Sequence, residues 1–222
     1  MTTYSMHPGS LVVLEGLDAT GKSTQLAALE ALAWDEPKPM FTHQPSGTSE
    51  TSKQIYSITE KARDLKTHPI TLQLLHLASH AEHYDSSILP ALKDRSVVLD
   101  RCWWSTIAYG FFDGKLDRWC AIEDFIALCQ LPTQGQLPTV VFLFNQPYAL
   151  DEHNTHAVQA GYTFLASTYT PVRTVASVPS GTVKATTDWI VAELVSRGLV
   201  TLNYTQEELE AMADDSPTVP SP

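Results

Sequence analysis

The chain has 222 residues, which is long enough to bury a full hydrophobic core, and its 43% hydrophobic and 18% charged residues are typical of a globular protein. Its formal net charge of -11 argues against a nucleic-acid partner, because dedicated binders usually have a basic surface. No apolar run is long enough to span a bilayer, and no signal peptide is visible. The three cysteines, Cys102, Cys120 and Cys129, lack metal-site spacing, so reduced thiols in the cytoplasm are expected.

The first predicted elements enclose a glycine-rich loop. Residues 1–9 are expected to be a loosely ordered lead, residues 11–14 a buried strand and residues 25–32 a helix. The loop between strand and helix fits the phosphate-binding pattern G-x-x-x-x-G-K-[ST]. Its glycines let backbone N–H groups turn toward an anion, and the helix start adds partial positive charge. The residues predicted to bind ATP are Gly16, Leu17, Asp18, Ala19, Thr20, Gly21, Lys22, Ser23 and Thr24.

The remaining elements alternate between strands and helices. Strands are predicted over residues 38–42, 97–100, 139–144 and 172–178. Helices are predicted over residues 51–65, 103–113, 117–130, about 155–168 and 182–197. A further long helix is predicted to begin at residue 69, and its apolar face extends to residue 92. This alternation predicts a doubly wound parallel sheet that binds ligands at the carboxyl ends of its strands. A domain over residues 10–200 precedes an acidic, Pro-rich tail over 201–222, in which Thr205 to Glu208 form a capping box for a short helix.

Two charged residues follow the strand over 97–100. Asp100 at such a strand end is suited to Mg²⁺ or its water shell, together with the Ser23 hydroxyl. Arg101 is suited to hold a phosphate through two parallel hydrogen bonds. Asp18 lies inside the glycine loop, where it would repel phosphate unless it contacts metal-bound water or an acceptor hydroxyl. Trp103 and Trp104 come next, and their rings either pack in the core or line the pocket beside Arg101.

Several motifs at matching spacing resemble the thymidylate kinase family over roughly residues 10–198. Residues 15–25, EGLDATGKSTQ, resemble the family's E-G-x-D-x-x-G-K-[ST]-T, and residues 74–83, LLHLASHAEH, are similar to its L-L-F-A-A-x-R-x-E-H helix. Residues 88–92 (ILPAL), 99–101 (LDR) and 105–109 (STIAY) follow at the family's spacing.

The resemblance implies a P-loop kinase with a three-layer αβα fold, a five-stranded parallel sheet and a short lid. It implies phosphoryl transfer from ATP, with Mg²⁺, to a deoxynucleoside monophosphate, and a homodimer. Lys22, Asp18 and Arg101 would be catalytic, and Ser23 and Asp100 would hold the metal. Tyr109 would pack against the deoxyribose. The implied substrate-binding residues are Asp18, His43, Pro45, His76, His80, Arg101, Thr106, Tyr109 and Gly110.

The chain departs from the family mainly at the substrate. His76 replaces a base-stacking Phe, His80 an Arg that reads the thymine edge, and Gly110 a common Gln, while the loop over 42–48 lacks an Arg. Imidazole cannot reproduce the fork of a guanidinium, so an altered base preference is expected. No Lys or Arg occurs between Arg118 and Arg173, and the loop position used by other members for an Arg is Ala19.

These departures leave two alternatives open. One is a kinase for a hydroxyl on a modified pyrimidine, in a nucleotide or in DNA. The other is a nucleotide-binding interaction protein with little catalysis, since a missing charge-stabilising Arg is costly in phosphoryl transfer. His153 and His156, in the presumed lid, are the residues available to replace that Arg, although imidazole is mostly uncharged at neutral pH.

Overall fold

The main sheet has five parallel strands in the order β3-β4-β2-β5-β6. The computed structural model describes residues 2–47, 49–149, 151–167, 175–206 and 208. The strands are β2 (Leu11–Gly16), β3 (Met40–His43), β4 (Val97–Asp100), β5 (Val140–Phe144) and β6 (Val175–Ser177). The predicted five-stranded parallel sheet is therefore confirmed, and the expected strand over residues 172–178 is described only from residue 175.

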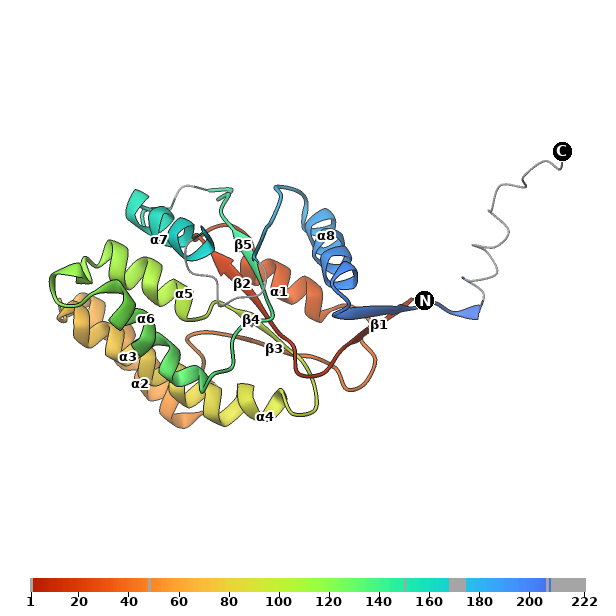
Figure 1. The fold of residues 1–222 in the computed structure, drawn as a ribbon, viewed down its shortest axis with the longest axis horizontal. Coiled ribbons are helices and arrows are strands. Elements are labelled where there is room, and N and C mark those ends of the chain that lie inside the picture. The colour runs from red at the N-terminus through yellow and green to blue at the C-terminus, as the bar shows by residue number, and fades with distance from the viewer. Residues whose placement is uncertain (1, 48, 150, 168–174, 207, 209–222) are drawn as a thin grey trace.

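Helices cover both faces of this sheet (Figure 1). Side chains of β2 alternate between two cores, because successive residues of a strand point to opposite faces. Leu11 and Val13 pack with the core under α3 (Pro69–His83), α6 (Ile122–Gln130) and α7 (His156–Ser167). Val12 and Leu14 pack with the core under α1 (Lys22–Glu30) and α8 (Val183–Ser196). Helix α2 (Glu50–Asp64) lies along α3, and the three-layer architecture is confirmed.

Two helical stretches contain wider turns. Helix α3 continues through a π-helical segment, Tyr84–Ile88, into α4 (Leu89–Ala91). Helix α5 (Trp103–Ser105) continues into a second π-helical segment, Thr106–Asp113. Trp103 and Trp104 are fully buried in the core, as in the first of their two interpretations. The expected helix over 117–130 begins only at residue 122, because Ala121 is extended and a 3-10 turn, Leu116–Arg118, stands before it.

The two ends of the domain pair with each other. Strand β1 (Thr3–Met6) runs antiparallel to β7 (Val200–Asn203), with Thr3 opposite Asn203. The expectation of a loosely ordered lead is therefore wrong for residues 3–6, and residues 201–203 belong to a strand and not to a tail. The reason is packing, since Met6 and Val200 are buried in the core beside α8.

Beyond β7, the predicted capping box is confirmed. The Thr205 N–H donates to Glu208 Oε2 at 2.9 Å, and the Glu208 N–H donates to Thr205 Oγ1 at 3.3 Å. The part of the predicted acidic, Pro-rich tail over residues 209–222 lies outside the described residues. Among the residues that the structure describes, no helix has the length and apolar character needed to cross a bilayer.

Candidate active site

Three strand ends meet at one edge of the sheet. Leu14 of β2 lies opposite Asp100 of β4, and Gly16 lies opposite Phe144 of β5. Because all three strands are parallel, the glycine loop, the Asp100–Arg101 pair and the segment after β5 start from the same edge. This is where ligands bind in open α/β sheets.

The glycine loop has the backbone that the motif predicts. Gly16 has φ +132°, and a Cβ there would overlap the backbone of Phe144, so only glycine fits this close approach. Gly21 has φ +89° and is the left-handed N-cap of α1, with no side chain capping the helix. The first-turn N–H groups of α1 are therefore available to an anion.

Lys22 is buried at the start of α1. Its ammonium donates to the Leu17 carbonyl and to Thr20 Oγ1 at 3.2 Å, both in the glycine loop. Burial first, and then the neighbouring charge of Arg101, lower the pKa of Lys22 to about 8 against the opposing effect of Asp100, Glu15 and Asp18. A nucleotide phosphate placed here would favour the charged form.

The two residues predicted to bind the metal, Ser23 and Asp100, are in direct contact. The Ser23 hydroxyl donates to Asp100 Oδ2 at 2.6 Å, while Asp100 Oδ1 is buried without a hydrogen-bond partner. An orphaned carboxylate oxygen beside a hydroxyl is a hard oxygen donor set of the kind Mg²⁺ prefers. No group of three or more His, Cys, Asp or Glu side chains among the described residues could hold a metal by itself. A Mg²⁺ bound at this pair would take its remaining ligands from phosphates and water.

Arg101 forms an ion pair with Asp18 of the glycine loop. Its second guanidinium nitrogen donates to Asp18 Oδ1, and the other donates to Ser105 Oγ at 2.9 Å and to the Gly16 carbonyl at 3.3 Å. The guanidinium carbon lies 5.5 Å from the centroid of the Tyr109 ring. The cation is thus held at the junction of the loop and the helical segment after β4.

The Glu15 side chain links the glycine loop, the segment after β4 and α7, and sequence reasoning did not select it. Its carboxylate is fully buried and accepts five hydrogen bonds from the two segments and from α7. The donors are the N–H groups of Gly16, Cys102 and Ser105 and the hydroxyls of Ser105 and Tyr162. The signal available was an acid inside an otherwise apolar strand.

A cavity of about 390 Å³ lies between the glycine loop, α3 and the segment after β4. Most of the predicted substrate residues line it, namely Asp18, Pro45, His76, His80, Arg101, Thr106 and Tyr109. Gln44, Gln73, Ser105, Asp113 and His153 also line it and were not selected as substrate residues from the sequence.

Two predicted substrate residues lie elsewhere. His43 is exposed at the end of β3, because strand alternation turns Thr42 toward His83 and leaves Gln44 to enter the cavity. Gly110 is covered by the side chain of Gln73 from α3. Burial lowers the pKa of His80 to about 3, with the charges of His76 and His83 acting in the same direction, so this imidazole is neutral.

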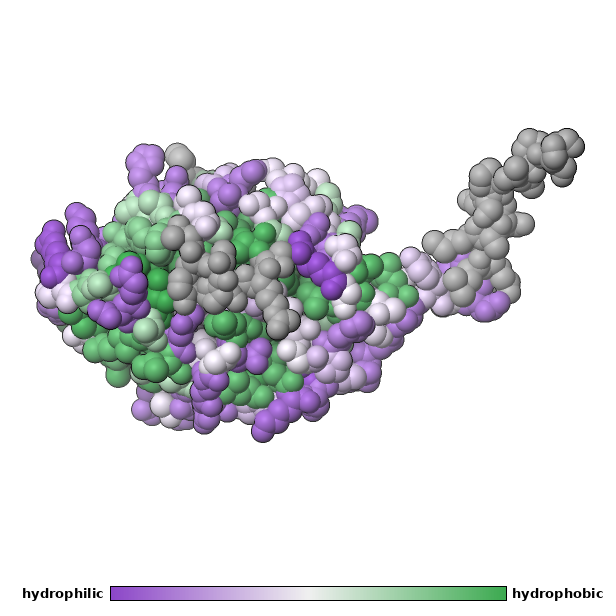
Figure 2. Space-filling view, viewed as in Figure 1, coloured by the Kyte–Doolittle hydropathy of each residue, from purple (hydrophilic) through white to green (hydrophobic). Residues whose placement is uncertain are grey.

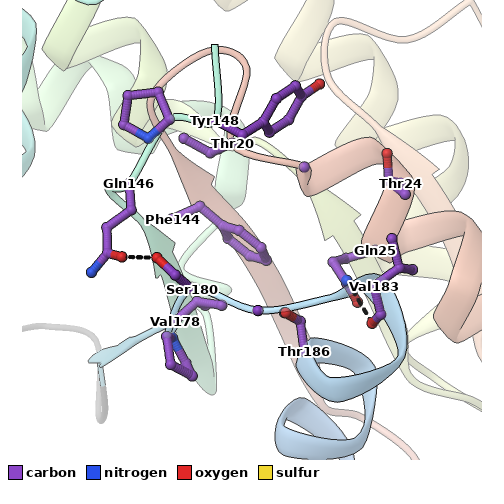
Figure 3. A pocket seen from close by; sticks show the side chains of 14 residues that line it. Thr20, Thr24, Gln25, Phe144, Gln146, Tyr148, Val178, Ser180, Val183 and Thr186 are labelled. Atoms are coloured by element: carbon purple, nitrogen blue, oxygen red, sulfur yellow. Dashed lines mark hydrogen bonds between the residues drawn. The ribbon is translucent and has the colours of Figure 1, made fainter.

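A second cavity, of about 360 Å³, lies on the other side of the glycine loop. Figure 3 shows Thr20 of the loop and Thr24 of α1 with residues at the end of β5, after β5 and β6, and at the start of α8. Gln25 joins two of these elements, since its amide donates to the Val183 carbonyl at 3.0 Å (Figure 3). The sequence predicted only the loop side; the other walls are Phe144 at the end of β5 and connections without a motif, including Gln146, Tyr148, Val178 and Ser180.

The connection between β5 and α7 contacts the glycine loop directly. Asn154 accepts from the Asp18 N–H at 2.7 Å and donates to the Asp18 carbonyl at 2.8 Å. The Tyr148 N–H donates to the Ala19 carbonyl at 2.9 Å. His153 lines the 390 Å³ cavity, whereas His156 does not. The segment expected to be a lid therefore reaches the first cavity through His153 and the second through Tyr148.

Fold and site together define a P-loop α/β protein with two cavities that share one phosphate-binding loop. The family model described as thymidylate kinase matches residues 14–157. The chain belongs to the thymidylate kinase family.

Known proteins agree with this assignment. The chain is 38% identical over 112 residues to a thymidylate kinase of Neorickettsia sennetsu, covering 48% of this chain and 52% of that protein. It is 34% identical over 149 residues to one of Synechococcus sp. (strain CC9311), covering 64% of this chain and 68% of that protein. The alignments thus span about half to two thirds of these relatives. A crystal structure of thymidylate kinase from Ehrlichia chaffeensis shares the fold, with a TM-score of 0.65 and 22% identity over 86% of this chain and 98% of that one.

Proposed function

We propose that the chain transfers the γ-phosphoryl group of ATP to a deoxynucleoside monophosphate. The observation that carries the proposal is that one loop lines two cavities. Asp18 lines the 390 Å³ cavity, whereas Thr20, Gly21 and Thr24 line the 360 Å³ cavity. A donor nucleotide in the second cavity would reach the loop with its phosphates, and an acceptor phosphate in the first would meet Arg101. Such an arrangement brings two substrates together in line, which is most of what catalysis of this reaction requires.

Each residue then has a definite part. The N–H groups at the start of α1 and the charge of Lys22 hold the β- and γ-phosphates of ATP. Arg101, fixed by Asp18 and Ser105, holds the acceptor phosphate. Ser23 and Asp100 would hold Mg²⁺, which when bound neutralises charge on the phosphate oxygens. Tyr109, whose ring lies beside Arg101, would pack against the sugar of the acceptor.

The acceptor cavity supports an altered base preference. Its α3 side presents Gln73, His76 and His80. A neutral imidazole at position 80 offers one donor and one acceptor and no charge. The net charge of -11 opposes DNA as the acceptor, because binding to a polyphosphate backbone depends on cationic surface. ATP as donor and three free cysteines support a cytoplasmic location.

A coupled turnover assay with each deoxynucleoside monophosphate tests the proposal. We expect turnover with at least one acceptor, and a loss of about 10²- to 10³-fold in kcat for Lys22→Ala. Arg101→Lys keeps the charge but loses the fork, so the acceptor KM should rise more than the ATP KM. Arg95→Lys is the matched control, since among the described residues the Arg95 side chain bonds only to the neighbouring Asp94 at the surface. ATP binding without turnover of any acceptor would refute the proposal and leave a nucleotide-binding protein with little catalysis.

We also propose a homodimer, formed through α3 and α6. Leu74 and Leu131 are 49% and 70% exposed beside an apolar groove between α3 and the end of α6. Figure 2 shows hydrophobic residues gathered on the side where Figure 1 places α3 and α6. Sedimentation should give a dimer for the native chain and a monomer for Leu74→Glu with Leu131→Glu. A native monomer at micromolar concentration would contradict the proposed dimer.

A further inference from the structure

Gln73 occupies an unusual position in the acceptor cavity. It is 8% exposed and lines the cavity, yet its amide makes no hydrogen bond to any residue in the described part of the chain. Because the side chain lines the cavity, its amide is open to a ligand or to water there. Gln73, His76 and His80 have the i, i+3, i+7 spacing of one helical face, so α3 presents all three to the cavity together.

Gly110 provides the space that Gln73 fills. A Cβ at position 110 would come within 2.5 Å of Gln73 Cδ and 3.0 Å of Nε2. Any other residue at position 110 would therefore displace the amide. The φ angle of Gly110 is not in the left-handed region, so the backbone does not demand glycine there, and the three atoms nearest to an added Cβ all belong to Gln73.

The amide and its neighbour are adaptable hydrogen-bonding groups. A side-chain amide exchanges its donor and acceptor positions by turning over, and no hydrogen bond from the described residues fixes the amide of Gln73 in one orientation. His80 is 4% exposed, and its Nδ1 is buried without a partner. A neutral imidazole can carry its proton on either nitrogen. The lining residues on α3 include no Lys, Arg, Asp or Glu, so nothing charged imposes one polarity on this wall.

We infer that Gln73, seated over Gly110, is the specificity-determining residue for the base, and that it accepts both a 4-oxo and a 4-amino pyrimidine. The inference rests on the proposed nucleoside monophosphate site. A fixed donor would leave one of the two rings with an unpaired buried group, which is how polar sites reach large discrimination. An amide that turns over pairs with both rings and gives up that discrimination.

The pair dUMP and dCMP tests this inference, because the two rings have a 4-oxo and a 4-amino group respectively. Calorimetry without ATP measures binding, and the coupled assay measures turnover. In the native chain the two dissociation constants should agree within about 10-fold. Gln73→Glu, which as a carboxylate only accepts, should move their ratio at least about 10-fold toward dCMP. Gly110→Gln should weaken both, and adding Gln73→Ala to it should restore binding, since the new amide then has room.

The controls separate this inference from the proposed function. Thr71→Ala alters an exposed position on the same helix and should leave both constants unchanged. A native ratio above about 10-fold, or an equal effect of Gln73→Glu on both nucleotides, would overturn the inference. Binding of both nucleotides without turnover would instead refute the kinase proposal and leave the role of Gln73 supported.

Discussion

Replacing Glu15 with Gln should destabilise the fold by an amount that its hydrogen bonds define. Oε1 accepts two backbone N–H groups, from Cys102 at 2.6 Å and from Ser105 at 3.1 Å. Oε2 accepts the hydroxyls of Ser105 and Tyr162 and, at 3.2 Å, the Gly16 N–H. The amide oxygen of Gln would take the place of Oε1 because backbone donors cannot turn away. Its NH2 would then face two hydroxyls that can rotate to accept and one N–H that cannot.

The expected cost is therefore that of one unsatisfied buried N–H, about 2 kcal/mol. The remaining hydrogen bonds become weaker because the amide has no charge. This loss is offset in part, since the folded protein no longer has to bury a carboxylate. For a chain of this length, about 2 kcal/mol corresponds to a decrease of roughly 4–8 °C in Tm. Glu15→Ala leaves three N–H groups unsatisfied and should cost about 5 kcal/mol, close to the whole stability of a marginal domain.

Urea unfolding followed by circular dichroism measures both variants. Glu30→Gln, at an exposed position on α1, is the matched control and should be neutral within about 0.5 kcal/mol. Because Ser105 also holds Arg101, Glu15→Gln should raise the acceptor KM more than the ATP KM. A midpoint for Glu15→Gln equal to that of the control would refute the account of Glu15 as the link between loop and helix.

Three further perturbations test the charges and the connecting segment. Lys22→Met should raise the free energy of unfolding at pH 7 by about 3 kcal/mol, because the pKa of Lys22 falls from 10.5 to about 8 on folding. This gain should shrink between pH 8 and 10.5, as Lys22 loses its proton in the folded chain. A gain that stays constant with pH would contradict this account. The same pKa predicts that kcat/KM for ATP falls as pH rises through about 8, while in Lys22→Arg this decline should disappear. His153→Arg places a permanent cation in the acceptor cavity and should raise kcat about 10-fold, whereas His156→Arg, outside the cavity, should not. Asn154→Ala should raise both KM values several-fold by releasing the Asp18 backbone, with Thr163→Ala, at an exposed position on α7, as a control; equal effects of the two would argue against this role of Asn154.

The parts of the site that the sequence predicted are those built from contiguous residues. The glycine loop has a local cause for its shape, since Gly16 and Gly21 take backbone conformations that other residues rarely adopt. Asp100 and Arg101 were identified because a parallel strand must end at the same edge as its neighbour. In both cases a pattern of a few residues fixes the geometry.

The parts that were missed depend on contacts between distant residues. Strands β1 and β7 have four residues each, too few to form alone. They form because the two ends of the domain pair with each other, with Thr3 opposite Asn203. Gly110 was predicted to bind substrate from its place in a motif, yet a side chain from α3 covers it. Neither Gln73 nor Gly110 shows this relation in its own neighbourhood of the sequence.

The connection between β5 and α7 limits how this site can stabilise charge. Between Arg118 and Arg173 the sequence has no Lys or Arg, whereas Asp151 and Glu152 lie beside His153. The connection contacts the glycine loop through a neutral side chain, that of Asn154, and through the backbone of Tyr148. Under the proposed function, the positive charge around the migrating phosphoryl group would then come from Lys22, Arg101 and a bound Mg²⁺. Because Arg101 is already paired with Asp18, a bound Mg²⁺ would supply much of the remaining charge, which would make the Ser23–Asp100 pair a sensitive part of the site.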